Sequence, residues 1–132
     1  MKFITEHALC LGHLPAGAEE GAVRRFMSAR GAEWAWTHLR LEAAWAEGLT
    51  DPEARAAAVD LVGKVHATAA VLRPGSIAPP MLANGHWLME RTGLGAGGRL
   101  GRLKEWLYFL QVDRDITELA QLEALLGELD WR

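Results

Sequence analysis

Signals for β-strands are nearly absent from this sequence, and their absence constrains the fold more than any other feature. No run alternates β-branched and aromatic residues, and Ile, Val and Thr are few. Ala, Leu, Glu and Arg dominate instead, and these residues favour helices. Glycines and prolines divide the chain into short helical pieces. We therefore predict an all-α fold, a compact bundle of about six to seven short helices.

Capping residues, glycines and prolines also predict where these helices begin and end. Thr50 and Glu53 have the spacing of a capping box, with Pro52 in the first turn. Asn84 suits the start of a short helix, and Asp115 is a candidate N-cap for the last one. The expected helices span about residues 3–12, 19–30, 32–47, 50–73, 85–92 and 98–112, with a last helix from about 115 or 117.

The segment 73–80, RPGSIAPP, is the best internal boundary. Its three prolines and one glycine are typical of a linker or a sharp corner. We predict a helical body-like part at 1–73 and a helical tail-like part at 74–132. One compact domain stays open as the alternative, because 132 residues is also the length of a single domain.

Hydropathy, charge and cysteine content exclude several classes of protein. No apolar run approaches the roughly 20 residues that cross a bilayer, and polar residues interrupt the short apolar start, so we expect neither a membrane span nor a signal peptide. Cys10 is the only cysteine, which excludes an internal disulfide and a cysteine-based zinc site. We expect a cytoplasmic location. The formal net charge of −3 argues against strong non-specific RNA binding, since free-standing nucleic-acid binders are usually basic.

Several patterns resemble catalytic motifs but lack the context that the chemistry needs. Residues 93–98, GLGAGG, match GxGxxG, but a dinucleotide site needs a preceding strand, and here a helix precedes it. Asp113 and Asp115 form a DxD pair that is not on a strand. The five histidines show no i, i+4 pair, and Cys10 is interpreted as a small buried thiol. We expect no catalytic residue, no metal and no cofactor.

The glycine turn opens onto the start of a predicted helix, where free backbone amides can hold a phosphate. The most basic stretch of the chain surrounds this turn, with no acidic residue between positions 91 and 104. We predict an RNA phosphate-binding patch made of Arg91, Gly97, Gly98, Arg99, Arg102 and Lys104. The alternative is a solvated helix face without a ligand.

The chain contains six tryptophans, which are the residues best suited to stacking on a base. Trp34 and Trp45 lie on one face of the expected helix 32–47, and we predict that they belong to the core. Trp36 and Trp87 are predicted to be exposed and available for base stacking. Helix 32–47 is apolar nearly all round, so we expect it to be buried or to contact a partner.

Motifs in the second half of the chain carry a family resemblance. Residues 82–89, LANGHWLM, lead into residues 92–103, TGLGAGGRLGRL, and an Ile-Thr-Glu step at 116–118 opens the last helix. This order resembles the C-terminal helical region of bacterial CCA-adding tRNA nucleotidyltransferases and their poly(A) polymerase relatives. The segments 22–26, AVRRF, and 39–43, LRLEA, are similar to earlier helices of that family. The resemblance covers about residues 20–130.

The sequence also departs from this family. Trp87 stands where the family usually has Asp, Ala96 and Gly98 stand where it has prolines, and no catalytic head with paired metal-binding aspartates is present. The resemblance therefore implies a module that binds tRNA or another structured RNA and is catalytically inactive alone. Three alternatives stay open for it: a fragment, a split-off subunit that works with a separate catalytic-head chain, or a decayed relative. The alternative is a helical protein-interaction or dimerisation module that uses the Trp-rich helix 32–47 and forms a homodimer.

Overall fold

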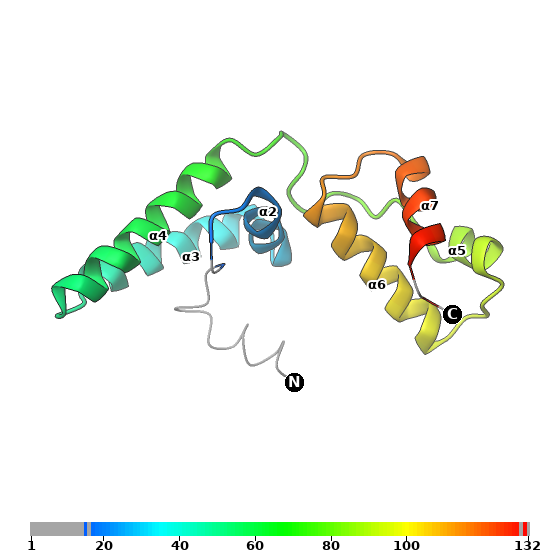
Figure 1. The fold of residues 1–132 in the computed structure, drawn as a ribbon, viewed down its shortest axis with the longest axis horizontal. Helices are drawn as coiled ribbons and strands as arrows, with labels where there is room; N and C mark the ends of the chain where they lie inside the picture. The colour runs from blue at the N-terminus through cyan, green and yellow to red at the C-terminus, as the bar shows by residue number, and fades with distance from the viewer. Residues whose placement is uncertain (1–14, 16, 130, 132) are drawn as a thin grey trace. The chain divides into compact units, whose positions relative to one another are not determined.

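The computed structural model describes residue 15, residues 17–129 and residue 131. These residues form six α-helices and no strand, which confirms the predicted all-α class (Figure 1). In chain order the helices are α2 (Glu20–Ala29), α3 (Ala32–Glu47), α4 (Pro52–Ala70), α5 (Gly85–Thr92), α6 (Gly98–Asp113) and α7 (Leu119–Glu128). The expected helix at 3–12 and Cys10 lie outside the described residues. Within the described part of the chain, no helix combines the length and the hydropathy that crossing a membrane requires.

The chain divides into two units, Met1–Ala78 and Pro79–Arg132. The division falls inside the proline-rich segment 73–80. Helices α2, α3 and α4 belong to the first unit, and α5, α6 and α7 belong to the second. Each unit has its own cluster of buried apolar side chains.

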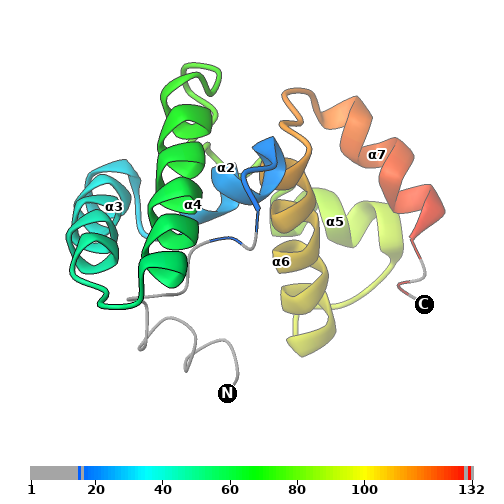
Figure 2. The same cartoon turned by 60° about the vertical axis from the view of Figure 1, so that its left-hand side comes forward.

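In the first unit, α3 and α4 run side by side as a helical hairpin, and α2 packs against both (Figure 2). Each helix contributes apolar residues one or two turns apart, so that their side chains meet on one side. The buried cluster consists of Val23, Met27, Ala35, Leu39, Val65 and Ala69. Because these side chains come from all three helices, they hold α2 on the hairpin.

In the second unit, a leucine stripe along α6 faces α5 and α7. The buried cluster is formed by Ala83, Leu88, Leu100, Leu103, Leu107, Ile116, Leu122 and Leu126. Two polar side chains of α6 tie the chain before α5 to this core. Gln111 donates its Nε2 to the Pro80 carbonyl at 2.8 Å and accepts from the Leu82 amide at 3.1 Å. The Tyr108 hydroxyl donates to the Pro79 carbonyl at 2.7 Å.

The helix caps confirm some predicted ends and correct others. Asn84 accepts a hydrogen bond from the Trp87 amide at 2.8 Å, as predicted for the start of α5. At α4, however, the N-cap is Asp51, which accepts from the Ala54 amide at 3.1 Å, so the predicted capping box at Thr50 is wrong. The predicted start of the last helix at Asp115 or Thr117 is wrong as well.

The last helix, α7, begins two to four residues after its predicted start because a different capping pair forms. Glu118 is the N-cap, and Gln121 completes the capping box by accepting from the Glu118 amide at 3.1 Å. Asp115 instead adopts a left-handed backbone with φ of 51° in the turn after α6. An acidic residue tolerates such a turn position better than most side chains do.

Candidate functional site

The glycine turn between α5 and α6 is the first part of the candidate site. Gly93 ends α5 in a left-handed conformation with φ of 73°, and its amide donates to the Met89 carbonyl at 3.0 Å. Gly97 precedes α6 with φ of 155° and ψ of −168°, a combination that residues with a Cβ rarely adopt. The two glycines therefore fix the path by which the chain enters α6.

The first turn of α6 has backbone amides that no helical carbonyl accepts. No side chain caps this end of the helix, and the first intrahelical bond runs from the Gly101 amide to the Gly97 carbonyl at 3.0 Å. The amides of residues 98–100 consequently have no carbonyl within the helix to which they can donate. They lie at the positive end of the helix dipole, an arrangement that suits an anion.

Arg99 and Arg102 lie beside this helix start, and both are exposed. Arg99 donates from Nη2 to the Trp131 carbonyl at 3.1 Å. The Arg102 Nη1 lies 3.8 Å from the point where a Cβ on Gly98 would stand, so its guanidinium lies back toward the first turn. The structure thus brings Gly97, Gly98, Arg99 and Arg102 together at one end of α6.

Arg91 and Lys104, the other two predicted phosphate ligands, are placed differently. The Arg91 Nε pairs with Glu123 Oε1 at 2.9 Å, and its guanidinium lies 5.3 Å from the centroid of the Trp87 ring. Arg91 also borders an open hollow of about 530 Å³ that two acidic residues, Glu123 and Glu128, line as well. The aliphatic stem of Lys104 lies against the start of α5, with its Cδ 3.9 Å from where a Cβ on Gly85 would stand.

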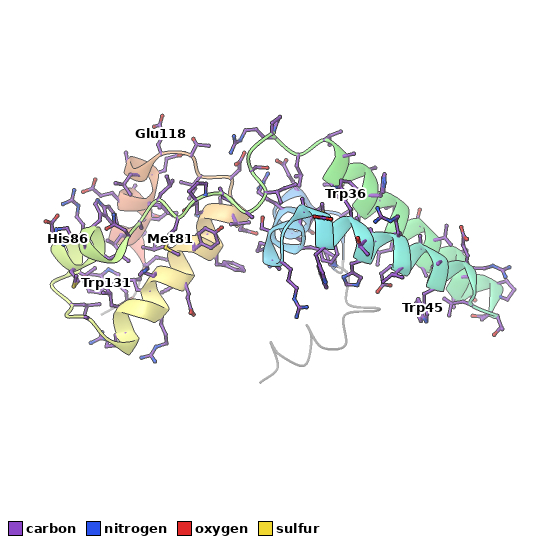
Figure 3. All side chains as sticks on the ribbon, turned by 180° about the vertical axis from the view of Figure 1, so that it is seen from behind. Trp36, Trp45, Met81, His86, Glu118 and Trp131 are labelled. Carbon is purple, nitrogen blue, oxygen red and sulfur yellow. The ribbon has the colours of Figure 1, made fainter. Side chains whose placement is uncertain are left out.

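The tryptophan predictions need correction. Trp36 and Trp87 are half-buried and pack against the cores of their units, so the prediction that they are exposed is wrong. Trp36 also contacts the His66 ring edge-on, at a centroid distance of 5.1 Å. Trp45, which was predicted to lie in the core, is 51% exposed (Figure 3). The reason is that the buried face of α3 continues through Glu42 and Ala46, and Trp45 lies to one side of that face.

Trp106 is the aromatic residue that the sequence reasoning missed. It is 41% exposed and follows Arg102 by four residues on α6, so the two side chains share one face of the helix. Arg99 precedes Trp106 by two turns on the same face, which borders the buried leucine stripe, because Arg99 and Trp106 lie four and three residues from Leu103. The i, i+3, i+7 spacing of these three residues was the signal that could have identified this surface. We call Arg99, Arg102 and Trp106 the outer face of α6.

No group of three metal-ligating side chains occurs among the residues that the structure describes. Asp113 ends α6 and Asp115 lies in the following turn, so the DxD sequence is not on a strand.

No known family model, curated protein or solved structure matches this chain. The resemblance to the tail of tRNA nucleotidyltransferases accordingly rests on the sequence motifs alone.

Proposed function

We propose that this chain is an RNA-binding module that holds tRNA or another structured RNA on the outer face of α6. The observation that carries the proposal is that Arg102 and Trp106 are both exposed, one helical turn apart. A guanidinium can pair with a backbone phosphate, and an indole offers its ring face to an unpaired base. The uncapped start of α6 lies at the end of the same face and favours an anion there.

The motifs in residues 82–103 support a more specific version of this proposal. By resemblance, the module corresponds to the body and tail of a CCA-adding tRNA nucleotidyltransferase or poly(A) polymerase. It would then be inactive alone, would reside in the cytoplasm, and would depend on a separate catalytic-head chain for nucleotide addition.

The charge of the chain limits how strongly it can bind RNA. The formal net charge is −3, and Glu105 lies next to Trp106 on α6. Arg91 is already paired with Glu123. We therefore expect modest affinity that depends on a few local cations and falls as salt rises.

The experiment is a titration of labelled tRNA with the protein at two salt concentrations, followed by fluorescence anisotropy. The test variant carries Arg99→Glu and Arg102→Glu. The control carries Arg55→Glu and Lys64→Glu, which make the same change in net charge on exposed positions of α4. We expect salt-sensitive binding that the test variant loses and the control keeps. Absence of binding by the native chain at low salt, or equal loss in both variants, would contradict the proposal.

A second candidate function is protein interaction through α3. The observation that favours it is the exposure of Leu41 and Trp45, which are 53% and 51% exposed and one turn apart on the same face. Two large apolar side chains exposed side by side form an apolar surface that a partner could cover.

A further inference from the structure

The hairpin of α3 and α4 is longer than the helix that covers it. From their residue counts, α2 is about 15 Å long, α3 about 24 Å and α4 about 28 Å. The buried cluster of the first unit takes Ala35 and Leu39 from α3, and Val65 and Ala69 from α4. On α3, burial continues past this cluster at Glu42 and Ala46, so one face of the second half is covered as well. Among the described helices of the first unit, only α2 packs on this hairpin.

The outward side of the second half of α3 exposes an apolar stripe. Leu41, Ala44 and Trp45 are exposed, and their i, i+3, i+4 spacing places them on one face of the helix. Trp45 projects outward from the hairpin (Figure 3). The small Ala44 beside Leu41 leaves room for another helix to approach closely. We call Leu41, Ala44 and Trp45 the α3 stripe.

Opposite charges border this stripe on one side. Arg40 precedes Leu41, and Glu47 follows seven residues after Arg40, so the two charged side chains lie along the same flank two turns apart. Both are exposed, and neither forms an ion pair with another described residue. Arg40 donates from Nη2 to the Thr37 hydroxyl at 3.0 Å, and no ion pair with it occurs within residues 17–129. Each charge is therefore available to a partner.

We propose that two copies of this chain associate through their α3 stripes as an antiparallel, two-fold symmetric pair. In such a pair a heptad arrangement places Leu41 against the partner's Ala44, and the same contact occurs a second time by symmetry. The same register brings Arg40 opposite the partner's Glu47 on the flank, again twice. Trp45 covers the other flank of the apolar layer.

The charge pattern favours a second copy over an unrelated partner. A wholly acidic partner would pair with Arg40 but repel Glu47, and a wholly basic partner would do the reverse. An antiparallel copy of α3 matches both charges at once, because its own Arg40 and Glu47 run in the opposite order. Self-association through the α3 stripe is a specific form of the protein-interaction function given above as the second candidate. It does not depend on RNA binding by α6.

The experiment measures the mass of the full chain by sedimentation equilibrium over a range of concentrations. We expect a monomer–dimer equilibrium for the native chain. Arg40→Glu alone and Glu47→Arg alone should each weaken the dimer about tenfold, because each places like charges opposite one another twice. An equimolar mixture of these two variants should restore association as a heterodimer, and the double variant should restore the homodimer.

Two more variants distinguish the loss of the dimer surface from the loss of the fold. Trp45→Gln should weaken the dimer strongly. Trp106→Gln, the same substitution at an exposed position of α6, should leave the dimer unchanged. Circular dichroism of each variant checks that the helices persist. A native chain that is monomeric at every concentration would overturn the proposal. So would a dimer that neither charge reversal weakens, or single variants whose mixture does not associate. RNA titrations of the same variants test the RNA-binding proposal independently of these outcomes.

Discussion

The imidazole Nε2 of His38 lies 3.1 Å from Oε1 of Glu42, one turn further along α3, and both side chains are only 3% exposed. The His38 ring also packs against the Phe26 and Trp34 rings, at centroid distances of 5.2 and 4.9 Å. A polar pair is thus enclosed within the first unit beside aromatic side chains. A buried carboxylate is strongly destabilising unless a partner compensates it.

Replacing Glu42 should therefore cost much more than replacing an exposed acid of the same helix. Glu42→Ala removes the acceptor for His38 and leaves a space in a buried position, so we expect a loss of roughly 3 kcal/mol in the free energy of unfolding. Glu33→Ala, at an exposed position of the first turn, is the control and should change it by no more than about 0.5 kcal/mol. Urea unfolding followed by circular dichroism measures both. A loss at Glu42 no larger than at Glu33 would contradict the importance of the buried pair.

The helix positions could be predicted from the sequence because their signals are local. Asn84 and Gly93 bracket α5 as predicted, since a cap depends only on residues within one turn of it. The same locality explains the errors at Thr50 and Asp115. In each case a better acceptor lay nearby, Asp51 at α4 and the Glu118–Gln121 pair at α7, and propensity alone does not rank such neighbours.

The exposure of single tryptophans could not be predicted, because it depends on which side of a helix its neighbours cover. Trp45 shares a helix face with Trp34, yet it lies to one side of the residues that α3 buries, which include Glu42 and Ala46. Trp87 was expected at the surface, but it packs against the core of the second unit and contacts Arg91. The pairing of Arg91 with Glu123 is also tertiary, since these residues lie on α5 and α7.

The backbone at Gly97 should make this position intolerant of a β-branched side chain. Gly97→Val forces a residue with a Cβ into φ of 155°, and we expect a loss of about 1–3 kcal/mol in the free energy of unfolding. The cause is backbone strain and not crowding, because a Cβ there would meet nothing within 4 Å. Gly95→Val in the same turn is the control, since Gly95 does not have a positive φ. Thermal unfolding compares the two, and equal melting temperatures would show that the Gly97 conformation is not required.

The single tyrosine gives the second unit a specific sensitivity to alkaline pH. Burial raises the pKa of the Tyr108 hydroxyl above its ordinary value of 10.0, and the hydroxyl donates to the Pro79 carbonyl. Because the folded-state pKa is the higher one, the stabilisation is fully present below the unfolded-state pKa and is lost as pH rises through the folded-state pKa. Since Tyr108 is the only tyrosine, tyrosinate absorbance should report its titration directly.

We expect this tyrosinate titration to shift toward the ordinary pKa in denaturant. Tyr108→Phe should cost about 1 kcal/mol at neutral pH and should remove the tyrosine contribution to the loss of stability above pH 10. Identical titration curves for the folded and the unfolded chain would contradict the predicted shift.

The salt dependence of RNA binding should distinguish the roles of Arg102 and Trp106. If Arg102 contacts a phosphate, Arg102→Gln reduces the slope of log affinity against log salt by about 0.7–0.9, because one fewer counterion is released. Trp106→Ala should instead lower the affinity by about 1–3 kcal/mol at every salt concentration and leave the slope unchanged, because stacking releases no counterions. Anisotropy titrations with labelled tRNA at four or more salt concentrations give both quantities. Lys64→Gln, at an exposed position paired with Asp60 on α4, is the matched charge control and should change neither. If Trp106→Ala alters the slope as much as Arg102→Gln does, the change reflects a general disturbance of α6. The separate roles proposed for Arg102 and Trp106 would then be wrong.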